Sequence, residues 1–148
     1  MITIDKSQLD AFRAKLNVKI EDMKETIIER LQYIGESAVK RAREVGNYED
    51  RTGNLRSSIG YSVLWNGETV AEGGQQQITG SQGNGEDGLG ESQTLLNKLK
   101  GEFPKGAVLI VCAGMQYAWY VENVHHRDVL VSAELEAERL VKKLFKLD

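Results

Sequence analysis

The first third of the chain carries one long apolar stripe, which constrains the fold more than any other feature of the sequence. Ser7, with Asp10 three residues later, can cap the start of a helix, and Gly46-Asn47 can end it. The spacing therefore predicts a helix from about Ser7 to Val45, roughly 55 to 60 Å long at ~1.5 Å per residue. The apolar residues recur at steps of three or four, as on one face of a helix: Leu9, Phe12, Leu16, Ile20, Met23, Ile27, Leu31, Ile34, Ala38, Ala42 and Val45.

Such a helix is longer than a small sheet can cover, and two interpretations remain open. Asn17 or Gly35 could break it into two pieces that both cover the core. Alternatively, the helix is continuous and a neighbouring subunit completes its stripe, because uncovered apolar area usually marks an interface. Under the second interpretation the candidate interface residues are Leu9, Phe12, Leu16 and Ile20.

Three later segments predict a small, mostly antiparallel sheet. Ile59–Trp65 alternates apolar with smaller or polar residues, and Asn66-Gly67 favours a type I′ turn into Glu68–Ala71, so this region is expected to form a hairpin. Ala107–Ala113 is a continuous apolar run, which predicts a strand covered on both faces at the centre of the sheet.

A second helix follows near the end of the chain, with Asp128 placed to cap it. Its apolar positions are Leu130, Ala133, Ala137, Leu140, Val141 and Leu144. The order helix, strands, helix predicts a single α+β domain over residues 1–148, with the helices on one face of the sheet.

The segment from Gly73 to Gly106 differs from the rest in being rich in glycine and glutamine. It includes the run Gln75-Gln76-Gln77 and has almost no apolar residue before Leu95. We expect a long flexible insert, mobile above all from Gly73 to Gly90, with one or two helical turns at Thr94–Lys100.

The charge balance disfavours nucleic acid as a main partner. The chain has 19 Lys and Arg against 22 Asp and Glu, for a net charge of −3. Its single cysteine, Cys112, cannot form an internal disulfide, and Met1 to Leu16 does not have the pattern of an export leader, so cytosolic synthesis is expected. The longest apolar run is far shorter than the ~20 residues of a membrane helix.

Two local patterns resemble catalytic or binding sites but are better explained otherwise. Gly83–Gly88 matches G-x-G-x-x-G, yet no strand is expected before it and no helix after it, and Glu86 and Asp87 would repel a pyrophosphate. His125-His126, with Glu122 and Asp128, is the one cluster that could bind a metal, as in a small metal-dependent enzyme. Adjacent histidines rarely face one point, so surface histidines and no metal or other cofactor are expected.

A short basic group in the first helix leaves a second alternative open. Lys40, Arg41 and Arg43 are flanked by Glu36 and Glu44 at helical spacing, which favours a solvated face with ion pairs. The alternative is a DNA-contacting module that uses Lys40, Arg41, Arg43, Arg51 and Arg56.

Two motifs resemble a known family. Tyr48–Ile59 resembles the D-x-T-G-x-L-x-x-S-I signature of the tail-component family of long-tailed phages, whose members are also described as neck or tail-completion proteins. Thr52 in this segment can cap one helical turn. Tyr117–Glu122 is similar to the family's Y-A-x-Y-V-E, and Val129–Ala133 follows where the closing helix begins.

The resemblance implies a non-enzymatic protein of a phage or prophage particle, placed at the head-to-tail junction. The expected partners are connector and tail-tube proteins and further copies of the chain, in a ring, within a virion assembled in the host cytoplasm. The residues that match the two motifs, as architectural or contact positions, are Arg51, Thr52, Gly53, Leu55, Arg56, Ser58, Tyr117, Ala118, Tyr120 and Glu122.

Overall fold

The computed structural model describes residues 1–147 and has an α+β fold built on one long helix. Helix α1 (Lys6–Val45) runs without a break through Asn17 and Gly35, so the broken-helix interpretation is wrong. Gly35 serves close packing instead, because a Cβ built there would lie 2.5 Å from the ring of Tyr61.

The N-terminal cap of α1 is Asp5 and not Ser7. The Gln8 amide donates to the Asp5 carboxylate at 2.8 Å, and the Gln8 side chain accepts from the Asp5 amide at 3.2 Å, which completes a capping box. The Ser7 hydroxyl donates to the same carboxylate. The predicted start was therefore one residue late.

The sheet has three antiparallel strands in the order β2-β1-β3: β1 (Ile59–Trp65), β2 (Glu68–Gly73) and β3 (Ala107–Ala113). The hairpin is confirmed, with φ of 48° at Asn66 and 83° at Gly67, as a type I′ turn requires. The central position predicted for Ala107–Ala113 is wrong, because β1 is the middle strand. The apolar run of β3 reflects helices on both of its faces rather than strands on both of its edges.

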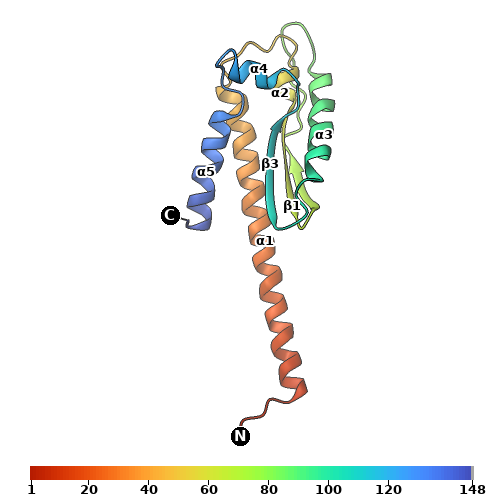
Figure 1. Ribbon diagram of the computed structural model, residues 1–148, viewed down its shortest axis with the longest axis vertical. Coiled ribbons are helices and arrows are strands. Elements are labelled where there is room, and N and C mark those ends of the chain that lie inside the picture. The colour runs from red at the N-terminus through yellow and green to blue at the C-terminus, as the bar shows by residue number, and fades with distance from the viewer. Residues whose placement is uncertain (148) are drawn as a thin grey trace.

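Helices cover both faces of the sheet, so the expectation of one covered face is also wrong (Figure 1). On one face, α1 and α5 (Val131–Phe145) pack against Ile59, Tyr61 and Val63. On the other, α3 (Glu86–Lys100) packs against Leu64, Ile110 and Cys112. Cys112 is buried in this second cluster, and its burial raises the pKa of the thiol to about 11.

Helix α3 occupies the second half of the segment that was predicted to be a flexible insert, and it is longer than the one or two turns expected at Thr94–Lys100. Its buried face consists of Gly88, Ser92 and Leu96, two of which are too small to produce an apolar periodicity in the sequence. The Gly83–Gly88 segment therefore does open a helix, contrary to expectation, although the strand that a dinucleotide site needs does not directly precede it.

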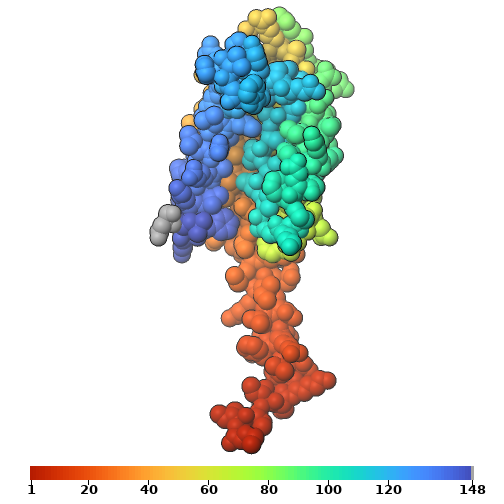
Figure 2. Space-filling model, in the orientation of Figure 1, coloured from red at the N-terminus to blue at the C-terminus, as the bar shows by residue number. Residues whose placement is uncertain are grey.

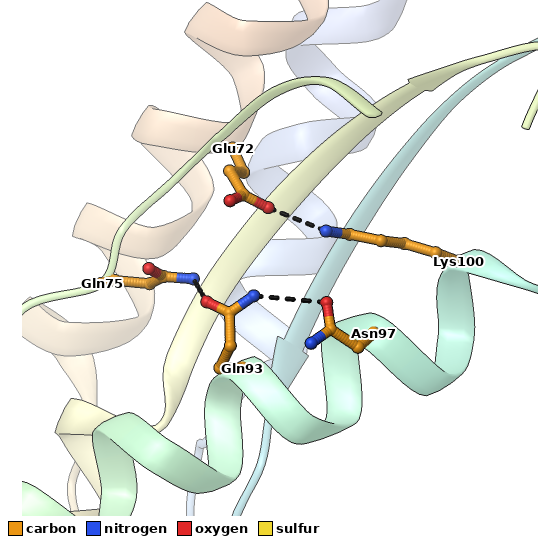
Figure 3. Close-up of polar contacts among 5 residues, drawn as sticks. All are labelled: Glu72, Gln75, Gln93, Asn97 and Lys100. Atoms are coloured by element: carbon orange, nitrogen blue, oxygen red, sulfur yellow. Dashed lines mark hydrogen bonds and ion pairs between the residues drawn. The ribbon is translucent and has the colours of Figure 1, made fainter. Parts of the chain in front are cut away.

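Polar contacts hold α3 and the glutamine run against the edge strand β2, as Figure 3 shows. Lys100 forms an ion pair of 2.8 Å with Glu72. Gln75 donates to Gln93, and Gln93 donates to Asn97 at 3.3 Å. The ion pair thus attaches α3 to β2, and the contact between Gln75 and Gln93 joins the two halves of the insert to each other.

Only the second half of α1 belongs to this body. The buried residues of α1 begin at Leu31, whereas residues 1–23 are all exposed. Figures 1 and 2 show this part of the helix projecting alone below the rest of the molecule. We call Lys6–Met23 the arm. In the described part of the chain, no helix is both long and apolar enough to cross a membrane.

Candidate assembly site

The first family-like motif forms a tight junction between α1 and the sheet. Its single helical turn, α2 (Asn54–Ser57), begins with two side-chain acceptors. The Thr52 hydroxyl accepts from the Asn54 amide at 3.3 Å, but the N-cap position is Gly53 and not Thr52 as predicted. The Asp50 carboxylate accepts from the amides of Leu55 at 3.3 Å and Arg56 at 2.8 Å, a contact that sequence reasoning missed.

Gly53 is required at this junction by both space and backbone conformation. Its φ is 77°, in the left-handed region, and a Cβ built there would lie 1.8 Å from the carbonyl oxygen of Ile78. The next turn secures the same loop, since the Ser57 hydroxyl accepts from the Ile78 amide at 2.7 Å. The motif therefore holds the loop around Ile78, which leads to α3.

Two arginines, Arg43 and Arg56, stabilise the junction by donating hydrogen bonds to backbone carbonyls. Arg56 donates to the carbonyl of Gly46 at 3.0 Å and lies 4.7 Å from the centre of the Tyr48 ring. Half-buried Arg43 donates to the carbonyls of Arg56 at 3.1 Å, Ile59 at 2.9 Å and Gly74. Burial raises the pKa of Tyr48 to about 12, so its phenol stays protonated.

These contacts correct the prediction of a solvated basic face. Lys40 does pair with Glu44, at 3.8 Å. Arg43, however, is directed inward, and Glu36 accepts from the Tyr61 hydroxyl at 2.6 Å instead of pairing with a cation. With Arg43 and Arg56 engaged by the protein's own carbonyls, the DNA-contacting alternative loses two of its cations.

The second motif packs directly on the first. Ala118, at the start of α4 (Ala118–Asn123), is buried in one apolar cluster with Tyr48, Leu55 and Val129. Just before the second motif, the Gly114 amide donates to the Ser58 carbonyl at 2.9 Å. The structure therefore brings together two motifs that lie about 60 residues apart in the sequence.

Glu122 caps the start of α5. One of its carboxylate oxygens accepts from the amides of Val129 at 3.3 Å, Leu130 at 2.8 Å and Val131 at 2.9 Å. Asp128, the predicted cap, accepts from the Ser132 amide at 3.1 Å. Both carboxylates thus occupy the positive end of the helix dipole.

The metal-like cluster is dispersed by these contacts. Glu122 and Asp128 face the amides of α5, while His125 lies edge-on to the ring of Tyr120 at 4.9 Å. Across residues 1–147, no three histidine, cysteine or acidic side chains come close enough together to hold a metal ion.

Replacing Glu122 with alanine is expected to lower the free energy of unfolding by about 1–2 kcal/mol, because three amides at the start of α5 lose their acceptor. Urea denaturation measures this change. Glu138→Ala on the same helix is the control, since its ion pair with Lys142 is exposed and should contribute under about 0.5 kcal/mol. Equal effects of the two variants would contradict the capping role.

The remaining motif residues are exposed and available for contact. Arg51 pairs with Glu49 at 3.2 Å, and Thr52 is exposed beside it. Burial raises the pKa of Tyr117, which is nevertheless partly exposed. We call the exposed apolar side chains around α4 the aromatic end: Tyr117, Trp119, Tyr120 and Val124.

The arm is the second exposed surface, and it contains all four predicted interface residues. Leu9, Phe12, Leu16 and Ile20 are between 39% and 62% exposed, and Met23 continues the stripe at 64%. The aromatic end and the arm lie at opposite ends of the molecule's long axis (Figure 1).

No family model, curated protein or solved structure matches this chain.

Proposed function

We propose that this chain is a structural protein of a phage or prophage particle that acts at the head-to-tail junction, in tail completion or in the neck. The observation that carries the proposal is the exposed stripe of the arm. A continuous helix with five large apolar side chains in water is costly unless something covers it. Full burial of one such side chain contributes about 1.5–3 kcal/mol, so covering the exposed part of the stripe favours association.

The two family-like motifs support the same assignment. They occur in the family's order, and their buried members pack against each other in this chain, so the two matched segments form one structural unit here. Within this unit, Gly53, Leu55, Arg56, Ser58, Ala118 and Glu122 have architectural roles, and Arg51, Thr52, Tyr117 and Tyr120 are left for contacts.

The positions of the two exposed surfaces favour a connecting role. A subunit with one contact surface at each end of its long axis can join two layers of an assembly. We assign the aromatic end to a connector or tail-tube protein and the arm to further copies of the chain, in a ring. The proposed role is non-enzymatic, because Glu122 and Asp128 serve as helix caps and Cys112 is buried.

Replacing Leu16 with aspartate is expected to abolish incorporation into particles while changing the thermal midpoint of the isolated chain little. Leu16 lies in the arm, where it is 46% exposed and not part of the subunit core. The test supplies the variant to a host whose prophage lacks the gene, and quantifies the protein in purified particles by mass spectrometry.

Two matched variants complete this test. Val18→Asp changes an exposed apolar residue two positions away, on the other side of the helix, and should incorporate normally. Ile34→Asp changes the same stripe where it is fully buried, and should collapse the thermal midpoint. Absence of the wild-type protein from purified particles would refute the proposed function.

A further inference from the structure

The arm continues the register of the helix face that α1 buries inside the subunit. The apolar steps are three, four and four residues, repeated along the whole of α1, so Leu9, Ile20 and Leu31 occupy equivalent positions eleven residues apart. An eleven-residue repeat corresponds to about 3.67 residues per turn, which keeps the stripe nearly straight along the helix. The arm thus offers a partner the same kind of surface that packs on the sheet and α5 farther up.

Basic and neutral side chains border this stripe on both sides. Gln8, Lys19 and Arg30 recur at eleven-residue intervals along one border, and Arg13 and Lys24 along the other. Arg30 and Lys24, the last residues of the two borders, contact other elements of the same subunit. Arg30 donates to the Leu144 carbonyl of α5 at 2.9 Å, and Lys24 lies 5.6 Å from the ring of Trp65.

The acidic residues of the same stretch lie away from the borders. Asp10, Glu21, Asp22 and Glu25 fall toward the opposite side of the helix at 3.6 residues per turn. Pairing two arms through their stripes would therefore bring basic borders together with no acidic residue between them. Like charges facing each other across a helix pair disfavour that pairing, so the surface that receives the arm should be acidic.

A groove with the required properties lies between α5 and β3. It has a volume of about 410 Å³, and its walls are apolar: Leu109, Val111, Leu130, Ala133, Ala137 and Val141. Glu134 and Glu138 line its rim and are exposed. One wall is the free edge of the sheet, since β3 pairs only with β1. The groove lies on the face that Figure 2 presents, between α5 and the edge strand.

The groove also matches the arm in length. Its residues on the α5 side run from Leu130 to Val141, and the four predicted interface residues of the arm run from Leu9 to Ile20. Both intervals are eleven residues, about 16 Å at ~1.5 Å per residue. Glu138 is free to change partner, because its ion pair with Lys142 is more than half exposed on both sides.

We propose that the arm of one copy of this chain lies in the groove between α5 and β3 of a second copy, with one of its two basic borders, that of Arg13 or that of Lys19, facing Glu134 and Glu138. The contact joins two different surfaces, so repetition closes a ring where the rotation permits it. This inference rests on the self-association included in the proposed function, but not on the particle in which that association would work.

Charge reversal on the two sides tests the contact in the purified protein. One variant, Arg13→Glu with Lys19→Glu, makes the arm acidic, and the other, Glu134→Lys with Glu138→Lys, makes the groove basic. Sedimentation velocity at low salt should show self-association of the wild-type chain and a Kd raised about ten-fold or more in each variant. Mixing the two variants should restore association, because each arm then meets a groove of opposite charge.

The control is Glu136→Lys, which changes an acidic residue of α5 that is not part of the groove and should leave association unchanged. Thermal midpoints establish that each variant is folded. A second measurement mixes Leu16→Cys with Ala137→Cys under oxidising conditions and should give a disulfide-linked pair. The wild-type chain should give none, because burial raises the pKa of its one thiol, Cys112, to about 11.

Three results would overturn the contact: a wild-type chain that stays monomeric at every concentration, groove variants that associate like the wild type, or a mixture that does not recover association. Weakening by the arm variant alone would indicate that the arm binds elsewhere. Any of these results combined with normal incorporation into particles would leave the proposed function standing and remove only this contact.

Discussion

The Gly53→Ala variant is expected to lose about 3 kcal/mol or more of its free energy of unfolding. A left-handed residue with a Cβ costs about 1–2 kcal/mol by itself, and Gly53 has a φ of 77°. The new methyl group would also lie 1.8 Å from the carbonyl oxygen of Ile78 and 2.7 Å from the amide nitrogen of Gly80. The loop must then move away, which separates Ile78 from Ser57. Urea denaturation monitored by circular dichroism measures the loss.

Gly90→Ala is the matched control for this prediction. Gly90 lies inside helix α3, and a Cβ built there has nothing within 4 Å. Alanine should therefore raise stability by about 0.5–1 kcal/mol, the difference in helix propensity between the two residues. A Gly53→Ala chain as stable as the wild type would show that the junction is looser than its geometry indicates.

The elements of the fold that the sequence could predict are those with a strong periodic or turn signal. The long helix, the hairpin and the apolar strand were predictable because each has a strong periodic or turn signal, such as Asn66-Gly67. Helix α3 was not, because Gly88 and Ser92 form its buried face and resemble loop residues in the sequence. Their small size allows α3 to approach α2, where a Cβ on Gly88 would lie 2.0 Å from the Asn54 carbonyl oxygen.

The candidate site was predictable to a different degree. Family-like motifs identified Gly53, Ala118 and Glu122 without revealing what each of them touches. The carboxylate of Asp50 and the guanidinium of Arg43 were missed as structural elements, because their roles depend on which backbone groups the fold leaves unpaired. The partners of Arg43 lie up to 31 residues away and have no local signal in the sequence, whereas Asp50 is the acidic residue of the D-x-T-G match and its partners are only five and six residues away.

The order of the strands was also beyond the reach of periodicity. A continuous apolar run such as Ala107–Ala113 indicates that both faces of a strand are covered, and this holds for β3, which lies between α3 and the α1–α5 layer. It carries no information on how many strands flank it. Because β1 and not β3 is the middle strand, one edge of β3 is free. The proposed groove for the arm lies beside that edge.

Replacing Arg43 with methionine is expected to lower the free energy of unfolding by about 2–4 kcal/mol. Methionine preserves much of the side chain's apolar length but removes every donor. The carbonyls of Arg56, Ile59 and Gly74 then lose a charged hydrogen-bond partner in a half-buried site. Since these carbonyls belong to α2, β1 and the start of the insert, the loss should also loosen the insert.

Arg41→Met separates this role from a general effect of removing a charge. Arg41 is two residues away on the same helix and exposed, so its replacement should change stability by under about 0.5 kcal/mol. Hydrogen exchange distinguishes the two variants further: Arg43→Met should accelerate exchange of the Ile78 and Gly80 amides, which lie in the loop beyond Gly74, and Arg41→Met should not. Equal stability losses in the two variants would mean that the carbonyls around Arg43 are satisfied by water, and that the junction does not depend on this guanidinium.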